Sequence, residues 1–268
     1  MITISPRQAF EDNMRPAELL LRVYRLLEND TVHTDGELVT ALRSTIGAVP
    51  DEGLMVIYNE IFLGLVRERA QIPVSAFKHS ALCNLLRQSI VAACTALDTY
   101  LPSMLRTHLP TVIQAKGRDF FPHEASIQEF FSDLKFDLSE TLRLLGDPEA
   151  PLFIANKILS LTSFKYLSSK KGINTVGSLL ALDKTWDQIA NTLQRDKKDL
   201  MNAIDETATR RNNIVHRADR PQSDPGGDIQ EISYSWSKHA VDTIMHVCLA
   251  FDELVAARML QLQTEVAE

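Results

Sequence analysis

Apolar residues recur along most of this chain at spacings of three and four residues, which is the pattern of amphipathic helices. Within the first 72 residues the pattern predicts three short helices, at 16–29, 35–46 and 51–69, with Pro73 after the last. The acidic residues of this part are scattered as on solvated helix faces. We therefore expect residues 1–72 to form a helical N-terminal extension that regulates the rest of the chain or supports a dimer.

The remainder of the chain, from Ser75 onward, continues the helical pattern with longer elements. Predicted helices lie at 75–108 (with Pro102 as a kink or restart), 127–145, 151–168, 175–182, 183–193, 196–216 and 237–263. Residues 219–228 (DRPQSDPGGD) are the most loop-like stretch, and strand-like alternation is confined to 229–234. The predicted fold class is all-α, with a helical domain over residues 75–264.

Composition narrows the classes of protein to consider. Hydrophobic residues make up 45% and charged residues 24% of the 268 residues, as in an ordinary globular protein. No apolar run approaches the roughly 20 residues of a membrane-spanning helix, and the N-terminus lacks the pattern of a signal peptide. We expect a cytoplasmic protein without a membrane partner. Three cysteines at no ligand-like spacing (Cys83, Cys94 and Cys248) predict neither a disulfide framework nor a zinc site.

Charge is distributed unevenly along the chain. The formal net charge of −7 argues against a protein that coats nucleic acid, because such binding depends on neutralising phosphates. Residues 208–220 (ATRRNNIVHRADR) nevertheless contain four arginines and one aspartate, whereas residues 124–149 contain seven acidic and two basic residues. A local basic site is therefore compatible with an acidic protein, and the basic segment is where it would lie.

The predicted helix at 196–216 carries an arginine where an apolar residue is expected. Its apolar stripe comprises Leu200, Ile204, Ala208 and Val215. Arg211 lies in the middle of this stripe, about 20° from Ile204 at about 100° per residue. A guanidinium on a core-facing line is unfavourable unless an acid pairs with it or the face opens onto a site. Asn212 and His216, four residues apart, share a neighbouring face.

Two interpretations of this cluster are open from its spacing. In a structural interpretation, Arg211 pairs with a buried acid such as Asp98. Asn212 then caps the helix, and His216 lies near its end for electrostatic reasons. In a functional interpretation, arginine, asparagine and histidine gather at the end of one helix to form a site beside a flexible loop.

The segment TATRRNNIVHRAD resembles the signature of the HEPN superfamily, in which an arginine, usually followed by a polar residue, precedes a histidine by four to six residues. It is most similar to the RiboL-PSP-HEPN subgroup. ALDTY (96–100) is similar to the end of the family's first helix, and KTWDQIANTL (184–193) lies where the family often has a Trp-x-x-Ile-Ala helix. The resemblance covers roughly 78–260, implies a HEPN-type helical bundle, and says nothing about residues 1–72.

The resemblance implies a metal-independent endoribonuclease that cleaves RNA through the ribose 2′-OH, without a cofactor, and acts as a toxin or antiviral effector. His216 suits proton transfer because the ordinary pKa of histidine lies near neutral pH. Arg211 suits the phosphate because it is a permanent, planar cation. Asn212 would orient His216 or bind phosphate. One protomer has one motif histidine, so the resemblance implies a homodimer with both motifs in one cleft.

Further basic residues are candidates for contacts with the RNA backbone. They are Arg210 and Arg217 in the motif, and Lys165, Lys170 and Lys171 in FKYLSSKKG. For the lysines a solvated helix face is the alternative interpretation. Asp98 is a candidate acid to support Arg211 or His216, with an ordinary helix-end acid as the alternative.

Two non-enzymatic functions stay open beside the nuclease: a HEPN module that binds RNA or nucleotide without cleaving it, and a helical interaction scaffold. Intact Arg211, Asn212 and His216 favour the enzyme. The absence of a glycine-rich phosphate loop and of a paired-acid metal motif disfavours a kinase or nucleotidyltransferase. For a toxin, an antitoxin or other regulatory protein is an expected partner.

Overall fold

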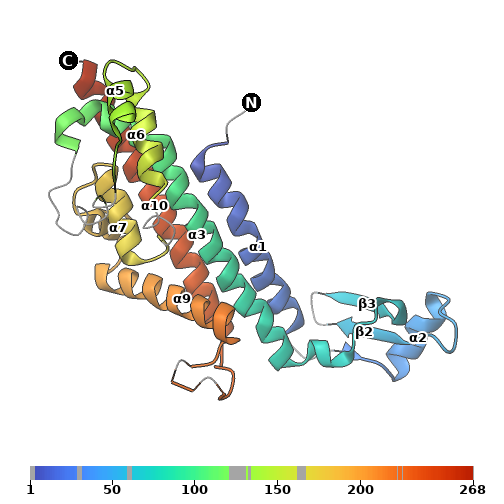
Figure 1. Cartoon of the computed structure of the whole chain (residues 1–268). Coiled ribbons are helices and arrows are strands. Elements are labelled where there is room, and N and C mark those ends of the chain that lie inside the picture. Colours follow the sequence, from blue (N-terminus) through green and yellow to red (C-terminus); the bar gives the residue numbers. More distant parts are fainter. Residues whose placement is uncertain are drawn as a thin grey trace.

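The computed structural model describes residues 4–28, 32–58, 62–120, 131, 134–161, 167–221, 223–224 and 226–267. In chain order its α-helices and strands are α1 (Pro6–Leu27), β1 (Val32–His33), α2 (Glu37–Thr45), β2 (Leu54–Tyr58), β3 (Leu63–Arg67), α3 (His79–Lys116), α5 (Leu138–Leu144), α6 (Ala150–Leu159), α7 (Lys170–Leu179), α8 (Thr185–Leu193), α9 (Lys197–Arg217) and α10 (Tyr234–Ala267). The fold is an all-α bundle, as predicted, with one small sheet (Figure 1).

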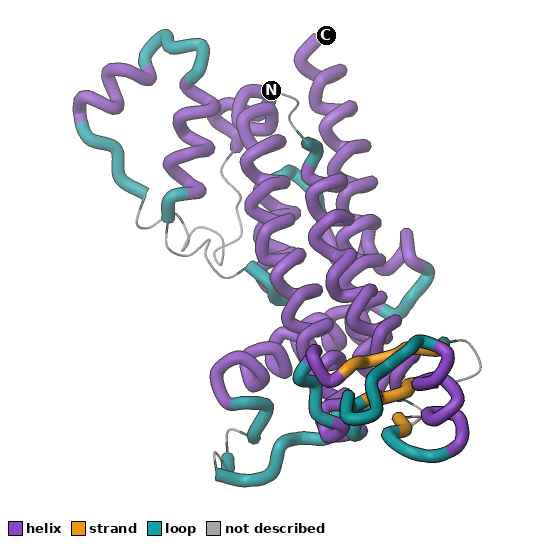
Figure 2. The backbone as a smooth tube through the Cα atoms, turned by 90° about the vertical axis from the view of Figure 1, so that its right-hand side faces the viewer, coloured by secondary structure: helices purple, strands orange, loops and turns teal. Residues whose placement is uncertain are grey.

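The bundle is built around α3. This helix lies between α1 and α10, and the three run side by side for most of their length (Figures 1 and 2), with α6 and α9 also packed on α3. Its apolar residues are buried at helical spacing along its whole length, including Leu86, Ile90, Leu97 and Leu109. This burial explains why the helix forms: packing of apolar faces supplies most of the stability of a helix in a protein.

Two prolines lie inside α3 without ending it. The helix continues through Pro102 and Pro110 to Lys116, whereas the sequence predicted a kink or restart at the first of them. Each proline removes one backbone hydrogen bond. Leu101 and Met104, on either side of Pro102, are buried in the bundle, and this packing holds the helix together across the interruption.

By length and composition alone α3 is apolar enough to cross a membrane, with a mean hydropathy of 1.2 over its most apolar window. Of that window 56% is buried within the bundle, and a buried core helix passes the same test.

The predicted helix at 51–69 is wrong. This stretch forms the antiparallel hairpin of β2 and β3, to which β1 adds in the order β1-β2-β3. Its apolar residues fit a helical period over a short window, but glycines at 53 and 64 disfavour a helix and its aliphatic residues favour strands. The strand-like stretch at 229–234 is likewise not a strand: its residues are irregular until α10 begins at Tyr234.

The first part of the chain contributes to two cores. Helix α1 begins ten residues earlier than predicted, at Pro6, and buries Phe10, Met14 and Leu21 in the main core against α3. Helix α2 confirms the predicted helix at 35–46 and forms a separate small core with β2, made of Val39, Leu54 and Val56. This second unit lies beyond the N-terminal end of α3 (Figure 1).

The remaining predicted helices are found with shifted bounds. Helix α5 lies inside the predicted 127–145, and α6 begins one residue before the predicted 151–168 and ends at Leu159; residues 121–130, 132–133 and 162–166 are outside the described residues. Helices α7, α8 and α10 correspond to the predicted 175–182, 183–193 and 237–263.

Helix α9, which carries the motif, was predicted to within one residue at each end. Asp196 caps its start by accepting a hydrogen bond from the N–H of Asp199, and Ala218 ends it in the left-handed conformation at φ 48°. The helix crosses the bundle and brings its C-terminal end beside α3 (Figure 1).

Candidate functional site

The buried face of α9 differs slightly from the predicted stripe. Its buried residues are Leu200, Ile204, Thr207 and Ile214. Val215 belonged to the predicted stripe, but it is 52% exposed. The buried line therefore follows the spacing 200, 204, 207, 211 and 214, and Arg211 still lies on it, as the sequence indicated.

Arg211 is held by an acid on the neighbouring helix. Its guanidinium forms an ion pair through Nη2 with Oδ2 of Asp98 on α3, and its Nη1 donates a hydrogen bond of 2.9 Å to Oδ1 of Asn212. The side chains of Arg211 and Asp98 are 21% and 26% exposed. This pairing is what the structural interpretation expected, and it also makes Asp98 a support for Arg211.

A buried thiol lies next to this pair. Cys94, one turn before Asp98 on α3, is buried, and burial raises its pKa to about 12, against a smaller opposing effect of Arg211. The thiol is therefore protonated near neutral pH and adds no charge beside the ion pair of Arg211 with Asp98.

His216 and Asn212 are exposed on the last two turns of α9. At about 100° per residue, His216 lies about 40° from Asn212 around the helix axis and about 140° from Arg211. Val215 lies between Arg211 and these two residues. We call Arg211, Asn212, Val215 and His216 the motif face. Within one chain the motif face spans about 140° around the axis of α9, so the side chains of Arg211 and His216 do not converge on one point.

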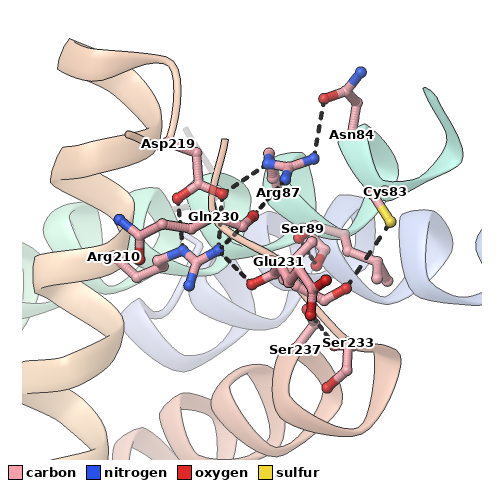
Figure 3. A network of polar contacts seen from close by, with 12 residues as sticks. Cys83, Asn84, Arg87, Ser89, Arg210, Asp219, Gln230, Glu231, Ser233 and Ser237 are labelled. Carbon is pink, nitrogen blue, oxygen red and sulfur yellow. Dashed lines mark hydrogen bonds and ion pairs between the residues drawn. The ribbon is translucent and has the colours of Figure 1, made fainter. Parts of the chain in front are cut away.

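The other motif arginine lies in a buried cluster of charges (Figure 3). Asp219 is fully buried, and its Oδ2 accepts hydrogen bonds of 2.7 Å from Nε of Arg87 and 2.8 Å from Nη2 of Arg210. Nε of Arg210 also lies 2.6 Å from Oδ1 of Asp219. We call Arg87, Arg210 and Asp219 the Asp219 cluster. Two guanidinium groups share one carboxylate in it.

The backbone around Asp219 joins three parts of the fold. Its N–H donates to the carbonyl of Asn213 at 2.9 Å, and its own carbonyl accepts from the N–H of Gln230 at 3.0 Å. The carbonyl of Gln230 in turn accepts from Nη2 of Arg87 at 2.8 Å. Asp219 has φ of 62°, a left-handed conformation that aspartate tolerates better than most residues. The cluster therefore fixes the end of α9 to α3 and to the segment before α10.

The other predicted phosphate contacts are not gathered around His216. The side chain of Arg210 is 16% exposed and committed to Asp219. Arg217 donates to Oδ1 of Asn213 at 3.4 Å. Nζ of Lys170 pairs with Asp205 at 2.9 Å, and Asp205 precedes His216 by eleven residues, about 16 Å along the helix.

Lys171 lies beside Lys170 at the exposed start of α7. Lys165 is outside the described residues. Of the predicted site residues, the structure thus brings together Asp98, Arg211 and Asn212, with His216 one turn further along α9.

Sequence reasoning missed Arg87 and Asp219. A signal for both was present: Arg87 interrupts the apolar run of LCNLLRQSIV, and Asp219 follows the motif directly. A charge in an apolar helix predicts a buried partner, but it does not say which acid that is.

Among the described residues, no three or more His, Cys, Asp or Glu side chains are grouped so that they could hold a metal ion. No protein-family model, no curated protein and no solved structure matches this chain.

Proposed function

We propose that this protein is an endoribonuclease that cleaves RNA by attack of the ribose 2′-OH on the adjacent phosphate. The observation that carries the proposal is the motif face, where an exposed His216 stands beside Asn212 and near an arginine already oriented by Asp98. The resemblance of this segment to the HEPN signature supports the same activity.

The chemistry needs two proton transfers and one cation. A neutral imidazole takes the proton of the 2′-OH as its oxygen bonds to phosphorus. A protonated imidazole gives a proton to the departing 5′-oxygen, leaving a 2′,3′-cyclic phosphate and a 5′-hydroxyl. Arg211 stabilises the additional negative charge on the phosphorane. Its contacts with Asp98 and Asn212 orient it beforehand, and preorganised charge is the main source of such stabilisation.

The active unit in this proposal is a homodimer. One chain supplies one motif histidine, and its Arg211 and His216 diverge by about 140° around α9. A second copy facing the first would complete an acid–base pair and set the arginine of one chain against the histidine of the other. Val215, an apolar residue 52% exposed at the centre of the motif face, is the side chain that this contact would cover.

The biological setting proposed with this activity is that of a cytoplasmic toxin or antiviral effector controlled by a partner protein. Expression of the wild-type chain in a bacterial host should then arrest growth and degrade RNA, and expression of His216→Ala should do neither. Equal growth and intact RNA in both strains would contradict this setting.

The chemical test is cleavage of RNA by purified protein in the presence of EDTA. We expect products that end in 2′,3′-cyclic phosphate. A strict requirement for Mg²⁺ or Mn²⁺, or products with free 3′-hydroxyl ends, would contradict the mechanism. Binding of RNA without any cleavage would favour the inactive-module alternative.

A further inference from the structure

A large cavity adjoins the Asp219 cluster, and Arg87 and Arg210 of the cluster line it. It has a volume of about 1020 Å³ and lies between the end of α1, the start of α3 and residues 229–236. The polar and aromatic residues that matter at its wall are Tyr24, Glu28, Asn84, Arg87, Arg210 and Trp236. We call it the α1–α3 cavity. Arg210 lies about 120° from His216 around α9, so the cavity is separate from the motif face.

The cationic part of the wall is not fully neutralised from within. Within the Asp219 cluster, Arg87 and Arg210 carry two positive charges against the one negative charge of the carboxylate that both contact. The cavity is also lined by Arg25, which pairs with Glu28, and by the exposed Glu231, which among the described residues forms no ion pair with either arginine of the cluster. Both guanidinium groups are largely buried, with side chains 10% and 16% exposed. A surplus charge removed from water is unfavourable unless an anion compensates it.

Part of the hydrogen-bonding capacity of Arg210 is also unused. Nη2 donates to Asp219 and to the carbonyls of Gln230 and Glu231. Nε is buried and forms no aligned hydrogen bond. Among the described residues Nη1 forms no hydrogen bond or ion pair, since the polar contacts of Arg210 run through Nη2 and Nε (Figure 3). This donor is available to a ligand in the cavity.

The start of α3 adds further donors at the same wall. His79 and Ser80, its first two residues, line the cavity, and no side chain caps this end of the 38-residue helix. The first N–H groups of a helix have no partner within the helix, and its dipole favours an anion there. Together with the free donor of Arg210, they make the cavity suited to a phosphate.

Aromatic side chains and a carboxylate also line the cavity. Tyr24 stacks on Tyr234 with ring centroids 6.0 Å apart, and Trp236 has the guanidinium of Arg210 5.6 Å above it. Glu28 contributes a buried carboxylate oxygen, Oε2, that accepts no hydrogen bond, although Arg25 pairs with it at 3.3 Å. Oε2 itself is out of reach of a ligand, but the Glu28 side chain is 25% exposed and lines the cavity, so a base with an exocyclic amino group would donate to the other oxygen, Oε1. The volume of the cavity is at the upper limit for small-molecule sites.

From these features we infer that the α1–α3 cavity binds a nucleotide, with its phosphate at Arg210, Arg87 and the start of α3 and its base toward Glu28 at the end of α1. The same chemistry is offered by a free mononucleotide and by the phosphorylated 5′ end of an RNA strand. The inference concerns binding and does not depend on RNA cleavage at the motif face.

Calorimetric titration of the full-length His216→Ala protein tests the inference without cleavage of the probes. The probes are 5′-AMP, inorganic phosphate, and one short oligoribonucleotide with a 5′-phosphate or a 5′-hydroxyl. Binding of 5′-AMP more tightly than inorganic phosphate is expected. A preference for the 5′-phosphorylated strand over both 5′-AMP and the 5′-hydroxyl strand assigns the cavity to RNA ends, and equal binding of both strands assigns it to free nucleotides. The inference is overturned if 5′-AMP does not bind and the 5′-phosphate does not strengthen binding of the oligoribonucleotide.

A pair of isosteric variants locates the binding. Oδ1 of Asn84, an exposed residue on α3, lies 3.4 Å from Nη1 of Arg87. Asn84→Asp supplies the missing negative charge, so 5′-AMP should bind at least about tenfold more weakly, the effect of losing one charge-assisted contact. Gln88→Glu adds the same charge one turn later, outside the cavity wall, and should bind as before. Thermal melting verifies that both fold. Equal affinities of folded Asn84→Asp and Gln88→Glu would contradict the assignment.

Discussion

At the scale of single residues, two adjacent arginines of the motif have different environments. Arg211 pairs with Asp98 at the edge of the motif face and keeps about a fifth of its side chain exposed. Arg210 turns the other way, into the Asp219 cluster, and helps to fix the end of α9. Adjacent residues on a helix point about 100° apart, so one of two consecutive arginines can lie at the surface while the other is buried.

The motif residues should contribute unequally to cleavage. His216→Ala and Arg211→Ala should each lower the rate at least about a hundredfold, because each removes a proton-transfer group or the cation at the phosphate. Asn212→Ala should cost less, since it orients rather than reacts. Single-turnover cleavage assays measure these rates. His239→Ala, which removes another exposed histidine on α10, is the matched control. Near wild-type activity of folded His216→Ala would show that the site is wrongly assigned.

Asp219 should be important for stability irrespective of activity. Asp219→Asn removes the only charge in the cluster that opposes its two arginines and should lower the free energy of unfolding by about 3–5 kcal/mol, as for a broken buried ion pair. Urea denaturation measures this value. Asp228→Asn, an exposed change in the same connecting segment, should leave it within about 0.5 kcal/mol. Equal stability of the two variants would mean that the cluster is not a stabilising anchor.

At the scale of elements, α3 and α10 are joined by a buried polar contact that should respond to pH. The hydroxyl of Tyr100 on α3 donates to the carbonyl of Cys248 at 3.1 Å and lies 3.2 Å from Oδ1 of Asp252 on α10. Burial raises the pKa of Asp252. This effect is larger than the lowering of the same pKa by Tyr100, Arg7 and His108. Burial also raises the pKa of Tyr100, so its hydroxyl stays protonated.

A carboxyl whose pKa is higher in the folded protein binds its proton more tightly there. Its contribution to stability is therefore present at low pH and is lost as pH rises from the ordinary aspartate value through the raised value. Asp252→Asn removes this dependence and still accepts from Tyr100. The variant should gain stability relative to wild type as pH rises above the ordinary aspartate pKa, as measured by urea denaturation over a series of pH values. Glu253→Gln, the same kind of change at the exposed neighbouring residue, serves as the control. If the free energy of unfolding of Asp252→Asn and of wild type changed in parallel with pH, the prediction would be contradicted.

At the scale of the whole molecule, the proposed dimer depends on the motif face. Val215→Glu places a charge at its centre and should convert the protein to a monomer and abolish cleavage. Leu142→Glu adds the same charge at another exposed apolar position, on α5, and should change neither property. Light scattering at micromolar concentration gives the mass of each variant. Monomeric wild-type protein that still cleaves RNA would refute a shared site.

A covalently linked dimer tests the sharing itself. If the two motif faces form one site, a linked dimer with a single His216→Ala subunit should lose nearly all activity. Retention of half the wild-type rate would indicate two independent sites, and the linked wild-type dimer provides the reference rate.

The sequence by itself determined the helical parts of this protein. Long amphipathic patterns identified α9 to within one residue at each end, because a period sustained over about six turns has few alternatives. It also placed Arg211 on a buried line and offered Asp98 as a candidate acid to support either Arg211 or His216, without deciding between them. It failed at 51–69, where a short apolar run fits a helix and a strand equally well and only the pairing of β2 with β3 and their packing decide.

Tertiary structure alone decided which charges meet. Arg87 and Asp219 are 132 residues apart in the chain, and no local pattern relates them. Their pairing arises because α3 and the end of α9 pack together and leave a buried carboxylate that must find cations. The same packing turned Arg210 inward, left Val215 outside and opened the α1–α3 cavity. A helical period fixes the directions of side chains around one axis, whereas the neighbours they reach depend on how the helices cross.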